Sequence, residues 1–170
     1  MTSRRFAILF ALAAFAAASL APPSPASAEP AFKRLLPYLI ALDGWEGQKP
    51  DGLSMDIGDK SMTTATRAYR RGSDQLHLSI VVGEAAKGAM APILMGMNVE
   101  TAESHFLTTT IAGFKAVKNY AAANKSGAVL IALADETLLS LAYERVGEDE
   151  ALSLVQKFDL KGIEAAATAP

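Results

Sequence analysis

Cysteine does not occur anywhere in this chain of 170 residues. Its absence excludes disulfide bonds, catalysis by a thiol and zinc sites with cysteine ligands. It also excludes a lipid anchor attached to a cysteine at the cleavage site of an exported protein. An exported domain without disulfide bonds depends on its apolar core for stability.

Positive charge and catalytic motifs are also scarce. The chain has 16 Lys and Arg residues against 18 Asp and Glu residues, with only two histidines and one tryptophan. A mildly acidic protein lacks the basic surface that nucleic-acid phosphates require, so we expect no nucleic-acid partner. Nucleophile-elbow, zinc-protease and phosphate-loop motifs are absent from the sequence. The composition favours a protein with no catalytic residues and no cofactor, and a small hydrolase is the weaker alternative.

The first 28 residues have the pattern of a secretory signal peptide. Two arginines precede an apolar run over residues 6–21, and residues 26–28 (Ala-Ser-Ala) match a small-x-small cleavage site. The run is short for a membrane-spanning helix, and three prolines follow it. Cleavage after Ala28 leaves 14 basic and 18 acidic residues, a net charge of −4. We expect a soluble periplasmic or secreted protein without a stable membrane anchor.

The second half of the chain predicts three strands and a closing helix. Residues 128–134 form a continuous apolar run, which is typical of a central strand covered on both faces. We expect strands at 108–120, with a glycine inside it, and at 138–146. A helix over residues 148–163 follows, because apolar residues recur there at helical spacing after three acidic residues.

The first half of the chain predicts a long hairpin of residues 61–71 and 75–83. The turn between them leaves the register open. A three-residue loop places Tyr69 opposite His77, whereas a loop of two or four residues changes the parity and removes this pair.

The remaining segments carry weaker patterns. Residues 29–42 indicate a helix in which Pro37 either causes a kink or marks the first turn of a shorter helix. Residues 49–60 indicate a loop with a short strand, and residues 84–104 indicate helical pieces over one side of the sheet. We therefore predict a single α+β domain over residues 29–164, in which helices flank an antiparallel sheet of about five or six strands. Residues 165–170 are predicted to be a flexible tail.

Four short motifs support a resemblance to a known fold. They are Gly44-Trp45, Arg67-Ala68-Tyr69 at the hairpin, the sequence Ile-Ala-Gly-Phe-Lys-Ala-Val at residues 111–117, and Phe158-Asp159-Leu160. With the order of the predicted elements, they resemble bacterial exported proteins related to the PsbP-like fold. The resemblance implies an antiparallel sheet flanked by helices and a role in binding or assembling other proteins. It implies no catalytic residues.

Three methionines in residues 84–104 are the first candidate site. Met90, Met95 and Met97 predict an adaptable apolar surface for a protein or apolar ligand. The same methionines, with His77 or His105, define the alternative of a copper(I) carrier, because thioether sulfur is a suitable soft ligand.

Polar and aromatic residues near the hairpin complete the predicted partner surface. Arg67, Tyr69 and His77, with two further arginines at positions 70 and 71, have the chemistry to receive an anion. A solvated strand face is the simpler interpretation of the same residues. Trp45 is included as a ligand platform, although a lone tryptophan more often anchors the edge of a core.

Overall fold

The computed structural model describes residues 30–58 and 60–169. The predicted signal peptide and its cleavage site after Ala28 lie outside these residues. Nine strands occur in the described residues: β1 (Glu46–Gly47), β2 (Asp51–Ile57), β3 (Lys60–Arg71), β4 (Asp74–Gly83), β5 (Val99–Glu100), β6 (Ser104–Ile111), β7 (Phe114–Ala121), β8 (Ser126–Ala134) and β9 (Thr137–Glu144). The helices are the 3-10 turns η1 (Ala31–Arg34) and η2 (Leu36–Tyr38), with α1 (Glu84–Leu94), α2 (Glu148–Val155) and α3 (Leu160–Thr168).

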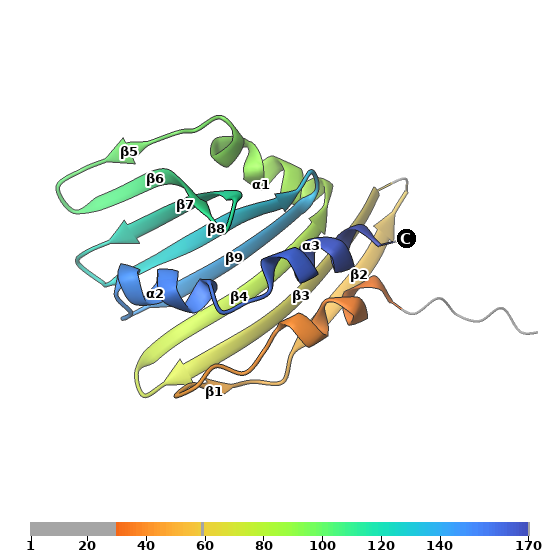
Figure 1. The fold of residues 1–170 in the computed structure, drawn as a ribbon, viewed down its shortest axis with the longest axis horizontal. Coiled ribbons are helices and arrows are strands. Elements are labelled where there is room, and N and C mark those ends of the chain that lie inside the picture. Colours follow the sequence, from red (N-terminus) through yellow and green to blue (C-terminus); the bar gives the residue numbers. More distant parts are fainter. Residues whose placement is uncertain (1–29, 59, 170) are drawn as a thin grey trace, which may run out of the picture.

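The strands join in one antiparallel sheet in the order β1-β3-β4-β9-β8-β7-β6-β5, with β2 also paired to β3 (Figure 1). This architecture fits the predicted α+β class, but the nine strands exceed the expected five or six. Strands β1 and β5 have two residues each, which is too short to show an alternating pattern. Strand β2 lies in a segment whose glycine, proline and aspartate content indicates a loop.

The hairpin of β3 and β4 is confirmed, and its register is now defined. Arg71 pairs with Asp74, so the loop has two residues. Tyr69 therefore pairs with Leu76, and His77 pairs with Ala68. The pairing of Tyr69 with His77 under a three-residue loop is wrong, and the two side chains point to opposite faces.

The single strand predicted over residues 108–120 is wrong, because this segment is the turn and both arms of the β6–β7 hairpin. Ile111 pairs with Phe114 across a two-residue turn. Ala112 and Gly113 both have positive φ, 49° and 91°, as a two-residue hairpin turn requires. Alanine seldom adopts this conformation, so the sequence favours a bulge at the glycine over a turn.

Helices cover the two faces of the sheet unequally. The first face packs against η1, η2, α2 and α3, which cross in front of the strands in Figure 1. The main core lies between these layers and includes Leu78, Ile131 and Leu141, all with no exposed surface. Among the helices of the described residues, only α1 packs on the second face, and its Met90 and Ile93 belong to a smaller core cluster. Strand β8 lies between β7 and β9, which confirms it as a central strand.

The closing helix predicted over residues 148–163 is divided into α2 and α3. Its apolar stripe is buried as predicted, including Leu154 and Phe158. Asp159 stands at the end of the break between α2 and α3. Its side chain accepts a hydrogen bond from the Gly162 N–H at 2.9 Å, which caps the start of α3. Helix α3 continues to Thr168, so residues 165–168 of the predicted tail are helical.

The two remaining segments also differ in detail from their predictions. The opening segment forms two short 3-10 turns instead of one kinked helix, and Pro37 lies in the first turn of the second, shorter element, as the alternative predicts. Helix α1 contains Pro92 and is followed by a connection to β5. None of the helices in the described residues is both long and apolar enough to span a lipid bilayer.

Candidate functional site

The half of the second face beyond α1 is an open groove. Its floor is one row of paired residues that crosses five adjacent strands from β3 to β7. The groove has a volume of about 510 Å³, and no residue of α1 lines it. Three of the five floor positions are alanine, and their small side chains leave open the space that larger side chains would fill. From β3 to β7 the floor residues are Ala68, His77, Ala142, Ala128 and Asn119.

The next row of residues forms a charged rim. Arg70, Gln75 and Glu144 lie side by side on β3, β4 and β9, and all three are exposed. With a strand spacing of 4.7–4.9 Å, the Cα atoms of Arg70 and Glu144 are about 10 Å apart. A donor and an acceptor of opposite charge therefore stand at separate points of the same groove. We define these residues and the floor as the groove site.

A close backbone approach shapes the floor between β7 and β8. The Tyr143 hydroxyl donates a hydrogen bond to the Asn119 carbonyl at 3.1 Å, and the Ala128 N–H donates to Asn119 Oδ1 at 2.5 Å. A Cβ atom at Gly127 would overlap both the Asn119 carbonyl and the Tyr143 ring. Burial raises the pKa of Tyr143 above its ordinary value, and Glu148 and Tyr120 raise it further. The glycine thus allows a buried, neutral tyrosine to support the groove from beneath.

Arg67 and Tyr69, two predicted site residues, lie on the first face and hold the opening segment. Arg67 Nη1 donates to the Leu39 carbonyl at 2.6 Å, and the Tyr69 hydroxyl donates to the Ile40 carbonyl at 2.7 Å. The guanidinium also lies 5.2 Å from the centre of the Tyr69 ring. These contacts link β3 to the chain after η2 and leave both side chains engaged within the fold.

Burial of Tyr69 predicts a loss of stability in alkaline solution. Burial raises the pKa of Tyr69 to about 12, partly opposed by the charge of Arg67. Tyrosines of the unfolded chain ionise near pH 10, so between about pH 10 and 12 the unfolded state has released the proton that the folded state retains. Stability therefore falls as pH rises through this window.

Urea unfolding between pH 8 and pH 11 tests the alkaline prediction. Tyr69→Phe is expected to be less stable than wild type at neutral pH by about 1 kcal/mol, because the Ile40 hydrogen bond is lost. Its stability should decline less steeply above pH 10, because one perturbed group has been removed. Parallel curves for the two proteins would contradict the assignment.

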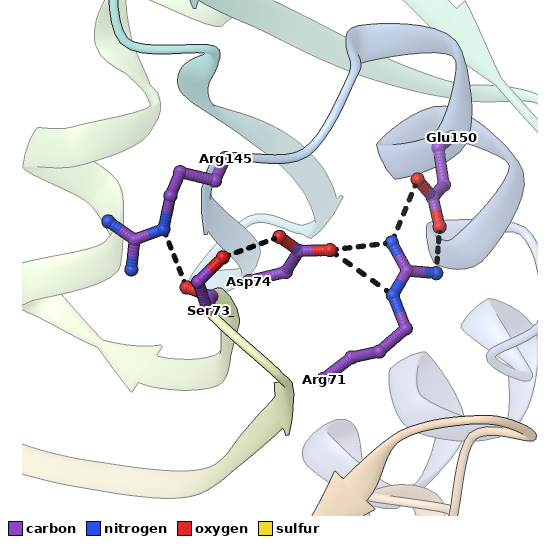
Figure 2. A network of polar contacts seen from close by, with 5 residues as sticks. All are labelled: Arg71, Ser73, Asp74, Arg145 and Glu150. Carbon is purple, nitrogen blue, oxygen red and sulfur yellow. Dashed lines mark hydrogen bonds and ion pairs between the residues drawn. The ribbon is translucent and has the colours of Figure 1, made fainter.

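Arg71 packs over the Trp45 ring and takes part in a polar network on the first face, which Figure 2 shows. The Arg71 guanidinium lies 4.3 Å from the centre of the Trp45 ring, and Trp45 is buried. Figure 2 shows Arg71 between Asp74 and Glu150. Arg71 Nη2 lies 2.9 Å from Asp74 Oδ2, and Arg71 Nη1 lies 2.6 Å from Glu150 Oε1. The hydrogen bonds to Glu150 and then Asp74 raise the pKa of Arg71 further above its usual value. The network ties the β3–β4 turn to α2, so the predicted anion set is divided between two faces. Tyr69, Arg70 and His77 line the groove, but only Arg70 and His77 lie on its face of the sheet.

The three predicted methionines occupy different environments. Met90 has no exposed surface and belongs to the core beneath α1, whereas Met95 is 76% exposed and Met97 is 43% exposed. Leu94 and Val99 beside them are 52% and 51% exposed. We define Leu94, Met95, Met97 and Val99 as the apolar lip. Val99 also lines a second hollow of about 350 Å³, which shares Asn119, Ser126 and Gly127 with the groove.

His105 lies away from His77. Its Nε2 atom is 2.6 Å from Glu148 Oε1 on the first face, and Lys118 Nζ is 3.3 Å from Glu148 Oε2. This cluster ties the start of α2 to β6 and β7. The neighbouring Ser104 points to the opposite face of β6, so Ser104 and His105 do not form a nucleophile–base pair.

The copper(I) residue set is not brought together. Met90 is buried under α1, and the two histidines lie on opposite faces of the sheet. Among the described residues, no group of three or more His, Asp or Glu side chains is placed to hold a metal ion.

Comparison with known proteins gives no assignment for this arrangement. No family model, curated protein or solved structure matches this chain. The resemblance to the PsbP-like fold therefore stays a prediction. Apart from His77, the groove floor was not predicted, because its alanines carry no reactive group and meet only through strand pairing.

Proposed function

We propose that the protein is a non-enzymatic binding protein that holds a partner protein or an apolar ligand on the second face of its sheet. The proposed location is the periplasm or the exterior of the cell, on the basis of the signal-peptide pattern in residues 1–28. The observation that carries the proposal is the groove beyond α1, with its alanine floor and charged rim.

The composition of the floor supports a binding role. An antiparallel sheet face that serves only to meet water usually presents larger polar side chains. Alanine contributes little to strand stability, so three alanines on one row bring no evident benefit to the sheet. They do leave room for a ligand to approach the strands closely. The rim then offers Arg70 and Glu144 to orient the ligand through charged hydrogen bonds.

A copper(I) carrier is the second candidate, supported by two exposed thioethers. Met95 and Met97 flank Gly96, whose φ is 71°, at the turn after α1. Two soft sulfur ligands two residues apart are compatible with copper(I). Met90 no longer contributes to this candidate, because it lies in the core.

Filling the groove tests the preferred proposal. Ala142→Trp places a large ring on the floor and should reduce capture of partner from an extract of exported proteins by at least about tenfold, the loss expected when a central contact is blocked. Quantitative mass spectrometry of pull-downs measures the effect. Ala165→Trp, on an exposed position of α3, is the matched control and should capture as wild type does.

A folding defect must be separated from a binding defect. Arg70→Glu changes an exposed rim residue and should fold normally while weakening capture. Thermal unfolding of each variant shows whether the fold is retained. Capture that is the same for wild type, Ala142→Trp and Arg70→Glu would refute the groove as the binding site.

A further inference from the structure

We infer that the apolar lip is a docking surface for a polypeptide segment that carries apolar side chains next to Lys or Arg. The inference rests on the proposed binding function and specifies its partner.

The exposed large apolar side chains are concentrated in one short stretch of the chain. Six large apolar side chains are exposed in the described part of the chain, and four of them lie within residues 94–99. Scattered apolar side chains are normal on a protein surface, but adjacent ones form the kind of patch that marks an interaction site. Contact with an apolar partner removes this surface from water, which favours binding.

The fold fixes the lip in place before any partner arrives. Helix α1 is anchored by Met90 and Ile93, which have 0% and 1% exposed surface. At the other end, the Thr108 N–H donates to Asn98 Oδ1 at 2.7 Å, and the Thr108 hydroxyl donates to the Met97 carbonyl at 2.9 Å. A preorganised surface loses less conformational entropy on binding than a mobile loop does.

Negative charge lies next to the lip along the chain, on strand β5 and in the turn that follows it. Residues 88–114 contain no Lys or Arg, and their only charged side chains are Glu100 and Glu103. Both carboxylates are exposed, and within the described residues neither forms an ion pair. Opposite charges steer association and set partner choice. The same acidic residues repel an anionic membrane surface, which favours a polypeptide occupant.

The lip is continuous with the groove site, which sets the shape of the occupant. Val99 pairs with Phe106, and both line the second hollow. That hollow shares Asn119 with the groove floor. A chain in extended conformation can therefore place apolar side chains on the lip and continue toward Ala128. A compact small molecule would occupy only one of these hollows.

Labelled synthetic peptides provide the test. Three peptides with the same apolar residues carry Lys, Gln or Glu at the flanking positions, and fluorescence anisotropy measures their affinity for the chain that begins at Glu29. The Lys peptide should bind at least about tenfold more tightly than the Glu peptide, and added salt should reduce this difference. Glu100→Gln with Glu103→Gln should remove the preference.

Lip variants identify where the peptide binds. Met95→Gln with Met97→Gln should weaken binding of the Lys peptide by at least about tenfold, whereas Met95→Leu with Met97→Leu should preserve it. Leu53→Gln is the matched control, because Leu53 is 49% exposed on β2, far from the lip in sheet order. Its affinity for the Lys peptide should equal that of wild type.

Four results would overturn the inference. The first two are equal binding of all three peptides, and unchanged binding of the Lys peptide by the variant Met95→Gln with Met97→Gln. The third is preferential binding to phosphatidylcholine or phosphatidylglycerol vesicles. The fourth is copper(I) binding that the variant Met95→Leu with Met97→Leu loses. Each of these results is independent of whether Ala142→Trp loses capture of the partner. A failed peptide test with groove-dependent capture intact would therefore reject this inference and retain the proposed function.

Discussion

Replacing Leu141 by alanine is expected to lower the free energy of unfolding by about 2–5 kcal/mol. Leu141 has no exposed surface and lies on β9, in register with Leu78 on one side and Val129 on the other. The loss combines the transfer free energy of the deleted methyl groups with the cavity that the rigid neighbouring strands leave open. Urea unfolding followed by circular dichroism measures the change.

The matched control for this core variant is Leu94→Ala. It deletes the same atoms from a side chain that is 52% exposed on the lip. Surface substitutions change stability by about 0.5 kcal/mol or less, so the two variants should differ by several-fold. Similar losses for both would mean that β9 does not lie at the centre of the core.

Gly83→Ala is expected to lower the free energy of unfolding by about 2–6 kcal/mol, from backbone strain and steric overlap together. Gly83 has φ 110° and ψ −169°, a conformation open almost only to glycine. An added Cβ atom would also overlap the carbonyl oxygen of Ser61 on β3. The residue cannot move away easily, because its N–H donates to the Glu136 carbonyl at 2.8 Å.

Gly88→Ala provides a control of opposite sign. Gly88 lies inside α1 with ordinary helical backbone, and no atom lies within 4 Å of the Cβ position. Alanine should stabilise the helix there by about 0.5–1 kcal/mol. Thermal unfolding of the two variants should therefore shift in opposite directions, and a loss of stability in both would contradict the structure at the start of α1.

Elements with a long and regular pattern were predictable from the sequence. Strand β8, the β3–β4 hairpin and the buried stripe of α2 depend on residues close together in sequence. The turn at Ala112 and Gly113 was not predictable, because its alanine adopts a backbone conformation unusual for that residue. Edge strands of two residues depend on pairing partners and have no local pattern of their own.

The candidate site was predictable only in part, because exposure and pairing are properties of the folded chain. His77 was selected and does line the groove, but Ala68 and Ala142 have no chemistry to distinguish them. The sequence does contain a pattern that distinguishes buried Met90 from exposed Met95. Ala86, Met90 and Ile93 are spaced as one helical stripe and are all buried, but Pro92 obscures the pattern.

The order of the strands has a consequence for how the chain folds. Most neighbouring strands are also neighbours in sequence, but β4 pairs with β9, and four strands and a helix lie between them along the chain. Local hairpins form in microseconds. Two strands that are far apart in the sequence pair more slowly, because closing the long loop between them has a large entropy cost. We therefore expect closure of the β4–β9 pairing to be the slow step of folding. Until it occurs, both strands expose unpaired edges that can aggregate.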